Sequence, residues 1–232
     1  MTEAILVASA VRKVYRTGAE ELVALRDVDF RVNIGEWVSV MGPSGSGKTT
    51  MLNCLSGLDD IDGGSVILGG RDLHAMSDAE RTRHRASAMG FIFQAYNLIP
   101  VFSAVENVEL PLLLAGVDAQ TARTQAAATL ERVGLGGRLR HRPTELSGGE
   151  QQRVTVARAL AGKPTVVWAD EPTGALDSET ADIVMNLLAE LHREGLTLIV
   201  VTHDEEVGRS AQRLVTMRDG RIVNDVNLAT VS

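Results

Sequence analysis

The stretch EWVSVMGPSGSGKTTMLNCLSGL, residues 36–58, joins an apolar run, a glycine-rich turn and a second apolar segment. Its run EWVSVM predicts a buried strand, and the segment after the glycines predicts a helix. The turn between them, GPSGSGKTT at residues 42–50, matches the pattern G-x-x-x-x-G-K-[ST]. We call residues 42–50 the phosphate loop. A strand, a glycine-rich loop and a helix in this order favour an α/β fold.

The chemistry of phosphate binding needs the residue types of this loop. Glycines let backbone N–H groups surround phosphate oxygens, and the following helix adds the positive end of its dipole. Lys48 can reach the β- and γ-phosphates, and the Thr49 hydroxyl can hold Mg²⁺. The candidate nucleotide-binding residues here are Gly42, Pro43, Ser44, Gly45, Ser46, Gly47, Lys48, Thr49 and Thr50. The loop predicts a bound nucleoside triphosphate, but leaves open which one and whether it is hydrolysed.

The composition favours a globular protein with a substantial core. The chain has 232 residues, of which 44% are hydrophobic and 23% are charged. A net charge of −7 argues against a dedicated nucleic-acid binder, and the basic run at 81–85 is better explained as a solvated helix face. Cys54 is the only cysteine, and no apolar run approaches the roughly 18 residues that a membrane span needs. We therefore expect a cytosolic protein that reaches a membrane only through a partner.

Short β-branched runs alternate with helical patterns along the chain. Apolar runs predict strands near the N-terminus and at 36–41, 90–94, 165–169 and 197–202, and helical patterns fall at 119–133 and 178–194. The sequence RLVTMRDGRIVNDV predicts a hairpin that turns at Asp219 and Gly220. This pattern favours a mostly parallel sheet, and the strand-poor stretch from about 95 to 160 favours a helical insertion.

Polar side chains follow three further predicted strands. Asp170 and Glu171 end TVVWADE, Gln94 ends GFIFQ, and His203 follows TLIVVT. In open α/β sheets ligands lie at the carboxyl ends of strands, so Asp170 is a candidate Mg²⁺ ligand and Glu171 a candidate general base. His203 could contact the γ-phosphate, and Gln94 could reach Mg²⁺ or the attacking water. Each residue alone has an ordinary structural explanation; the signal is their agreement with the phosphate loop.

A second glycine-rich helix start occurs in LSGGEQQRVTVARAL, residues 146–160. Ser147 and Glu150 have the spacing of a capping box, which explains both residues without a ligand. The box does not explain Gly148 and Gly149, since glycine in a helix costs up to about 1 kcal/mol relative to alanine. Bare N–H groups at the positive end of a helix attract anions, so this start is a second candidate phosphate site.

These motifs together resemble the nucleotide-binding subunit of ABC transporters. In chain order they are Tyr15, GPSGSGKTT, Gln94, LSGGEQQR (146–153), VVWADE (166–171), GALD (174–177) and His203. We call residues 146–153 the signature segment; its position between the phosphate loop and the acidic pair is the most specific match. The resemblance implies one ABC-type ATPase domain over residues 1–232, with the P-loop NTPase fold. That fold has a RecA-like core with a mostly parallel sheet, an antiparallel β subdomain and a helical subdomain at about 95–160.

The resemblance also implies a role for each candidate residue. Tyr15 would stack on adenine, while Lys48, Gln94, Glu171 and His203 would act in catalysis. The implied Mg²⁺ ligands are Thr49, Gln94 and Asp170. The residues implied to contact ATP on a second subunit are Ser147, Gly148, Gly149 and Gln151, with Asp177 in a dimer loop. ATP and Mg²⁺ are thus the expected cofactors, and a homodimer with two shared ATP sites is the expected assembly.

Finer features resemble the ATPases of lipoprotein-release, macrolide-efflux and cell-division systems: FIFQAYNLIP, VENVELPLLLAG and ADEPTGALDS. This subgroup implies that dimer closure drives a membrane permease. The permease would hold the ATPase on the inner face of the cell membrane, and no nucleic-acid partner is expected. Residues 95–115 would form part of a groove for a permease helix, with Asn97, Leu98 and Glu106 as candidates, or would only pack the helical subdomain. The sequence departs from the subgroup at two positions. Trp168 replaces the small aliphatic residue that is usual in the strand before Asp170, and Ala175 stands where the subgroup often has Asn.

Two other classes of function explain less of the sequence. Soluble ABC ATPases of DNA repair or chromosome organisation carry long coiled coils or zinc-binding cysteines, and this sequence has neither heptad runs nor paired cysteines. Strong stimulation of ATPase activity by nucleic acid would favour that class. A small-molecule phosphotransferase would leave LSGGEQQR unexplained, and release of free phosphate would exclude it.

Overall fold

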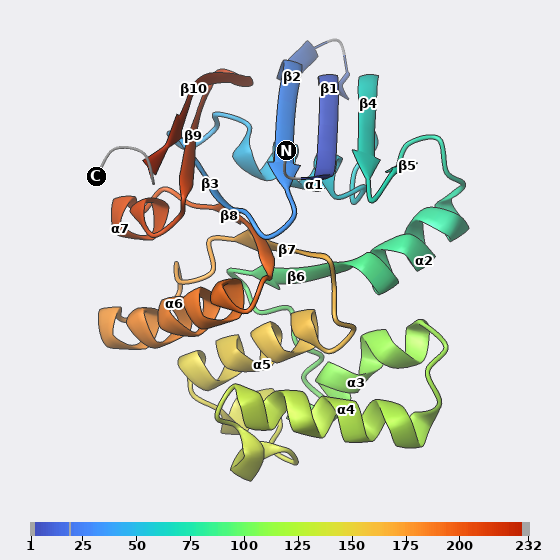
Figure 1. Ribbon diagram of the computed structural model, residues 1–232, viewed down its shortest axis with the longest axis vertical. Coiled ribbons are helices and arrows are strands. Elements are labelled where there is room, and N and C mark those ends of the chain that lie inside the picture. Colours follow the sequence, from blue (N-terminus) through green and yellow to red (C-terminus); the bar gives the residue numbers. More distant parts are fainter. Residues whose placement is uncertain (1–2, 19, 229–232) are drawn as a thin grey trace. The chain divides into compact units, whose positions relative to one another are not determined.

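A computed structural model describes residues 3–18 and 20–228 (Figure 1). The chain forms two compact units: unit 1 comprises Met1–Thr82 with Gly195–Ser232, and unit 2 comprises Arg83–Glu194. Unit 2 is one continuous segment inserted into unit 1, and it contains the whole stretch from 95 to 160 that the sequence predicted to be helical.

Unit 1 contains an antiparallel sheet with strand order β2-β1-β4-β5 (Figure 1). The strands are β1 (Ala4–Thr17), β2 (Glu20–Asn33), β4 (Gly63–Leu68) and β5 (Arg71–Asp72). The apolar side chains of β1 and β2 at Leu6, Val11, Leu25, Val28 and Val32 are buried. This sheet is the antiparallel β subdomain that the family resemblance implied.

Unit 1 also contains parallel strands. β3 (Trp37–Met41) pairs in parallel with both β8 (Thr197–Val201) and β9 (Arg213–Arg218), and β10 (Arg221–Asn227) pairs antiparallel with β9. β8 is buried along its whole length and β3 along almost all of it, as their continuous apolar sequences predicted. The predicted turn between β9 and β10 is confirmed, with positive φ at Asp219 and Gly220. The helices of this unit are α1 (Lys48–Leu55) and α7 (Glu205–Arg209).

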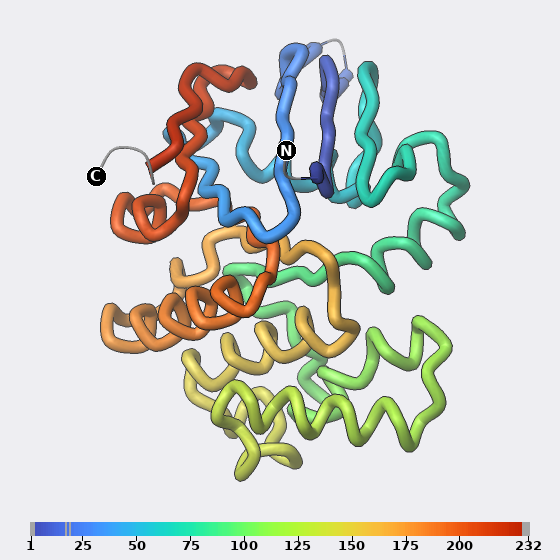
Figure 2. The backbone as a smooth tube through the Cα atoms, viewed as in Figure 1, coloured from blue at the N-terminus to red at the C-terminus, as the bar shows by residue number. Residues whose placement is uncertain are grey.

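Unit 2 combines two parallel strands with a helical region. β6 (Met89–Phe93) pairs in parallel with β7 (Val166–Asp170). The helices are α3 (Ala104–Leu114), α4 (Ala119–Arg132), α5 (Gly148–Leu160) and α6 (Ser178–Arg193), with short 3₁₀ turns η1 (Gly136–Arg138) and η2 (Pro143–Glu145). α2 (Asp78–Ala88) begins in unit 1 and leads into β6. Helices α3, α4 and α5 pack on one another, as the tube in Figure 2 also shows.

The glycine in β6 allows that strand to lie close to α5. A Cβ atom added at Gly90 would clash with the carbonyl oxygen of Ala159 and would lie 3.0 Å from its Cβ. These are atoms of the α5 backbone and its first side-chain carbon, which no rotamer change can move aside. Even one methyl group at this position therefore requires the strand and the helix to separate.

We expect Gly90→Ala to lower the free energy of unfolding by about 1–3 kcal/mol, the usual range for overpacking a core. Gly137→Ala is a matched control, because a Cβ there meets no atom within 4 Å. Urea unfolding followed by circular dichroism measures both variants. Equal stability of the two variants would contradict the proposed close contact.

Candidate nucleotide-binding site

The phosphate loop connects β3 to α1, as predicted. Gly47 is the N-cap of α1 with φ 100°, and a Cβ there would lie 2.7 Å from the carbonyl oxygen of Ala24. Gly42 has φ 154°, and a Cβ there would clash with the carbonyl oxygen of Met217. Both positions therefore need glycine for steric reasons, in addition to the backbone angle.

Lys48 folds back over its own loop. Its Nζ donates to the carbonyl oxygens of Gly42 at 2.8 Å and Pro43 at 3.1 Å, and the residue is buried. Ser46 is also buried, and within the described part of the chain its hydroxyl has no hydrogen-bond partner. A buried hydroxyl without a partner inside a glycine-rich loop fits a binding site for an oxygen-rich ligand.

The turn between β9 and β10 supports the phosphate loop. The amide of Gly220 donates to the carbonyl oxygen of Ser46 at 3.0 Å, and its carbonyl accepts from the amide of Arg26 at 2.8 Å. A Cβ at Gly220 would lie 2.6 Å from the carbonyl oxygen of Ala24. The sequence predicts this turn but not its contact with the phosphate loop, because an Asp-Gly pair signals only the turn.

His203 lies at the same sheet edge as the phosphate loop. β3 and β8 are parallel neighbours with Val40 opposite Val201, and the amide of Thr202 donates to the carbonyl of Val40 at 3.1 Å. The chain then leads from β3 into the phosphate loop and from β8 into His203, which is exposed. The predicted meeting of these two strand ends is confirmed.

Tyr15 of β1 is anchored beside α1 and is 37% exposed. Its hydroxyl donates to Asp59 Oδ2 at 2.8 Å, and the side chain of Thr50 in α1 also bonds to it. Partial burial and the hydrogen bond to Asp59 raise the pKa of Tyr15, although the bond from Thr50 opposes this shift. Tyr15 is therefore a neutral aromatic residue next to the helix that follows the phosphate loop.

Gln94, Asp170 and Glu171 meet at one edge of unit 2. β6 and β7 are parallel with Phe93 opposite Asp170, so Gln94 and Glu171 come next on adjacent strands. A Cβ at Gly174 would lie 2.9 Å from Gln94 Nε2 and 3.4 Å from Glu171 Cβ, which places all three together. Glu171 has φ 48°, a left-handed conformation that is strained for a residue other than glycine. The side chain proposed as base is thus held at an unusual backbone angle.

The signature segment begins α5 with the predicted capping box. The hydroxyl of Ser147 accepts from the amide of Glu150 at 3.2 Å, and Glu150 Oε2 accepts from the amide of Ser147 at 2.8 Å. The bond from the Ser147 backbone, together with Arg138, lowers the pKa of Glu150 despite partial burial. Gln151 donates to the carbonyl of Leu146 at 3.2 Å. The capping interpretation is confirmed for both residues that it was meant to explain.

The two glycines of the signature segment differ in their surroundings. Gly149 is buried, and a Cβ there would clash with the side chain of Thr180 in α6. Gly148 is half-buried, and a Cβ there would lie 3.0 Å from the hydroxyl of Tyr96. Asp177 caps α6, since it accepts from the Thr180 amide at 2.9 Å and from its hydroxyl at 2.8 Å. The structure thus gives Gly149 a packing role that the sequence could not reveal.

Comparison with known proteins identifies the family. The model of the ABC transporter family matches residues 25–174. The chain belongs to the ABC transporter family. It is an ABC ATPase, and the predicted P-loop NTPase fold is confirmed.

Several relatives match nearly the whole ABC ATPase chain. It is 45% identical to the uncharacterized ABC transporter ATP-binding protein MJ1508 of Methanocaldococcus jannaschii over 96% of this chain and 100% of the relative. The solved dimer of the ATP-binding cassette MJ0796 with ADP and Pi has a TM-score of 0.89 and 41% identity, over 96% of this chain and 98% of that one. A related cassette with this fold has therefore been solved with the products of ATP hydrolysis bound.

Other relatives are much longer than this ABC ATPase. It is 46% identical to the macrolide export ATP-binding/permease protein MacB of Shewanella oneidensis over 99% of this chain and 35% of that protein. It is 45% identical to the probable syringafactin export ATP-binding/permease protein SyfD of Pseudomonas syringae, over 97% of this chain and 34% of that protein. The chain thus spans about a third of the length of these export proteins.

Arg158 of α5 holds the strained segment that follows Gln94. Tyr96 and Asn97 both have positive φ, 56° and 51°. The Arg158 guanidinium donates to the carbonyl of Tyr96 at 2.8 Å and to that of Asn97 at 2.6 Å, and burial lowers the pKa of Arg158. The sequence does not predict this role of Arg158, because an arginine within a helical pattern resembles any other surface arginine.

The two departures from the subgroup have different surroundings. Trp168 is 1% exposed and faces Phe91 across the β6–β7 pair; within the described part of the ATPase its indole N–H has no hydrogen-bond partner. The large side chain is therefore accommodated in the buried interior of the protein. Ala175 is exposed in the loop before α6.

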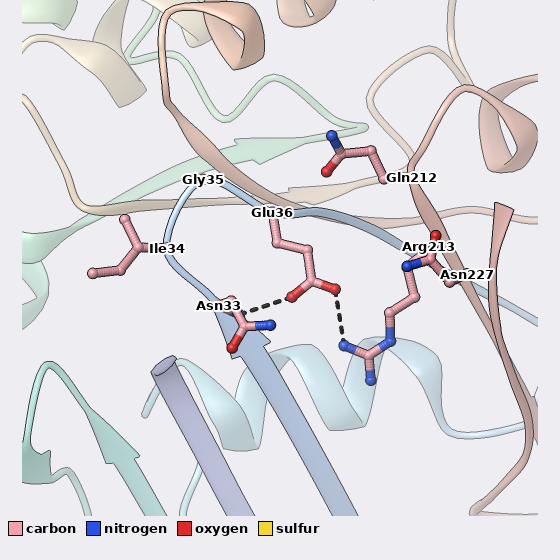
Figure 3. A pocket seen from close by; sticks show the side chains of 7 residues that line it. All are labelled: Asn33, Ile34, Gly35, Glu36, Gln212, Arg213 and Asn227. Atoms are coloured by element: carbon pink, nitrogen blue, oxygen red, sulfur yellow. Dashed lines mark hydrogen bonds and ion pairs between the residues drawn. The ribbon is translucent and has the colours of Figure 1, made fainter. Parts of the chain in front are cut away.

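A separate cavity of about 300 Å³ lies in unit 1 (Figure 3). It is lined by Asn33, Ile34, Gly35, Glu36, Gln212, Arg213 and Asn227, none of which belongs to the predicted site. Arg213 donates to Glu36 at 3.1 Å and to Asp225 at 2.6 Å, and these partners raise the pKa of Arg213 further. This cationic group is already engaged, so we interpret the cavity as part of a structural ion-pair network.

Proposed function

We propose that this ABC ATPase binds two ATP molecules between two copies of the chain, and that their binding and hydrolysis drive a membrane permease. The observation that carries the proposal is the pair of helix starts suited to anions, at α1 and at α5. The phosphate loop accounts for one ATP in each chain, which leaves the start of α5 for the ATP of a second chain. The related cassette MJ0796 was solved as a dimer, which supports this assembly.

The residues of unit 1 would hold the nucleotide. The phosphate loop surrounds the phosphates with backbone amides and Lys48, and Tyr15 stacks on the base. His203, at the neighbouring strand end, would donate to the γ-phosphate. In unit 2, Gln94 would orient the attacking water, and Glu171 would accept its proton.

Mg²⁺ is the expected metal cofactor. Its proposed ligands are the Thr49 hydroxyl, the Gln94 amide oxygen and the Asp170 carboxylate, and Mg²⁺ prefers such hard oxygen donors completed by water and phosphate. When bound, it neutralises charge on the β- and γ-phosphate oxygens. No group of three or more His, Cys, Asp and Glu side chains gathers as a metal site in residues 3–18 and 20–228, and a site completed by nucleotide phosphates does not need one.

The capping box is compatible with an anion site at α5. The box engages the amides of Ser147 and Glu150, whereas the amides of Gly148 and Gly149 have no acceptor within the helix. Ser147 is exposed and Gly148 half-buried, so both are open to a second chain. We propose that Ser147, Gly148 and Gln151 contact the γ-phosphate of the partner's ATP, with the Gly149 amide as a further donor. Asp177 would lie in the dimer interface while also capping α6.

We propose that residues 95–115 receive the permease. Val101 is 69% exposed and Leu114 is 72% exposed, so both apolar side chains are accessible to another protein. Asn97 is exposed and Leu98 half-buried, whereas Glu106 accepts from the Ser103 amide at 2.7 Å in a capping box. Glu106 is thus the weakest of the three candidates.

The membrane would be reached through the permease. Among the described helices none is long and apolar enough to cross a membrane. The names of MacB and SyfD combine an ATP-binding and a permease part in one protein. We therefore propose an export-type or mechanotransmission system with the ATPase on the inner face of the cell membrane.

The base assignment predicts that Glu171→Gln binds ATP and accumulates an ATP-bound dimer, because an amide cannot accept the proton from water. Its hydrolysis rate should fall by at least about 100-fold. Phosphate release and size-exclusion chromatography with ATP measure both effects. Lys48→Ala is the contrasting variant and should lose ATP binding itself. Near-normal turnover by Glu171→Gln would contradict the assignment.

The proposed contact across the dimer predicts that Gly148→Asp keeps ATP binding by the monomer but loses dimer closure. A carboxylate beside the γ-phosphate places like charges together, so hydrolysis should fall by about 100-fold. Gly137→Asp is the control, since it adds the same charge where a Cβ meets no atom within 4 Å. ATP affinity by calorimetry and dimer content by light scattering distinguish the steps. Normal hydrolysis by Gly148→Asp would leave the capping box as the only role of this helix start.

The proposed permease surface predicts that Leu114→Asp separates the ATPase from its membrane partner without changing its own ATPase rate. Leu22→Asp in unit 1 is the control, because Leu22 is 66% exposed, close to the 72% of Leu114. Affinity purification from detergent-solubilised membranes of the source organism should recover a membrane protein with the wild type and the control only. Equal recovery with all three proteins would contradict this docking surface.

A further inference from the structure

A short acidic loop between α1 and β4 grips the segment of β1 that contains Tyr15. Asp59 Oδ1 accepts from Lys13 Nζ at 2.7 Å, and Asp59 Oδ2 accepts from the Tyr15 hydroxyl at 2.8 Å. Asp62 Oδ2 accepts from the amide of Val14 at 2.7 Å. One carboxylate thus bridges two side chains of β1, while a second holds the backbone between them.

The Lys13 ammonium also lies against the aromatic ring. Its Nζ is 5.1 Å from the centroid of the Tyr15 ring, within the range of a cation–π interaction. The pairing of β1 with β2 shifts register between Lys13 and Val14, so it is the short distance between ammonium and ring, and not strand alternation, that places the two side chains together. Lys13 is 9% exposed whereas Tyr15 is 37% exposed, so the lysine is enclosed and the tyrosine remains accessible.

The acidic loop is itself fixed from a second direction. Arg81 donates to Asp60 Oδ1 at 2.6 Å and to Asp78 at 2.8 Å. The carbonyl oxygen of Asp60 accepts a further bond from Lys13 at 2.7 Å. Burial alone would raise the pKa of Asp59 and lower that of Lys13, but their mutual hydrogen bond reverses both shifts, so both groups are charged near neutral pH.

We propose that Lys13 and Asp59 are positioning residues that hold the Tyr15 ring in place to stack on the base of ATP. This inference rests on the base-stacking role proposed for Tyr15 above. A cation on one face of the ring draws π electrons toward itself, which favours stacking of an electron-rich purine on the other face. The bond to Asp59 fixes the far end of the ring, so less side-chain entropy is lost when the base binds.

The test is a double-mutant cycle on ATP affinity, with Tyr15→Ala, Lys13→Met and the double variant measured by calorimetry in the presence of Mg²⁺. Tyr15→Ala should weaken ATP binding by about tenfold, as expected for loss of a base–aromatic stack. Lys13→Met should weaken it by about three- to fivefold in the wild type, and not at all in the Tyr15→Ala background. Asp59→Ala should behave as Lys13→Met does.

Two controls separate positioning from a merely structural role. Affinity for inorganic tripolyphosphate, which has no base, should stay within about twofold of the wild type in all of these variants. Lys13→Arg keeps a cation that can lie over the ring and should restore ATP affinity to within about twofold.

The outcomes also separate this inference from the proposed function. No effect of Tyr15→Ala on ATP affinity would overturn the base-stacking role itself. A loss with Tyr15→Ala but none with Lys13→Met or Asp59→Ala would overturn only the positioning role. An equal loss with Lys13→Met in both backgrounds would also overturn it, because Lys13 would then act independently of Tyr15.

Discussion

A phosphate group accepts hydrogen bonds from the amides of the phosphate loop but cannot donate to its carbonyl groups. Donors from the protein itself therefore have to satisfy these carbonyl groups. Lys48 meets this constraint by donating to the carbonyls of Gly42 and Pro43. The amide of Gly220, 174 residues beyond Ser46, donates to the carbonyl of Ser46. The loop is therefore supported by its own lysine and by a hairpin turn near the C-terminus. Glycine is required at Gly47 and at Gly220, because a Cβ would lie 2.7 Å or 2.6 Å, respectively, from the carbonyl oxygen of Ala24.

At the start of α5, the helix cap and the two glycines use different backbone amides. Ser147 and Glu150 satisfy each other's amides, which stabilises the helix start without using the amides of the two glycines. The capping box and an anion site are therefore not alternatives, because each uses different N–H groups. Gly149 adds a third requirement, since it also lets α6 approach through Thr180.

Local motifs made most of the fold predictable, together with the strand ends at which the candidate site residues lie, whereas contacts between distant polar residues were not predictable. The strands before the phosphate loop and before Asp170 were evident from short apolar runs, and the Asp219-Gly220 turn from its residue types. The contact of Gly220 with Ser46 had no sequence signal, since an amide-to-carbonyl bond places no demand on side-chain type. Arg158 was overlooked for a related reason: a helical arginine that binds two backbone carbonyls looks like a solvated one.

Charged side chains hold several residues of the candidate site in place through hydrogen bonds. Glu171, Tyr96 and Asn97 have left-handed backbone angles without being glycine, and the last two are held by the Arg158 guanidinium. Tyr15 is held by Asp59, which in turn is held by Lys13. Hydrogen bonds within each unit thus stabilise the strained backbone angles of Tyr96 and Asn97 and restrict the side chain of Tyr15. Less conformational entropy is then lost when a ligand binds. Each of these sets of hydrogen bonds lies within one unit: Arg158 and the two carbonyls that it binds are in unit 2, and Tyr15, Asp59 and Lys13 are in unit 1.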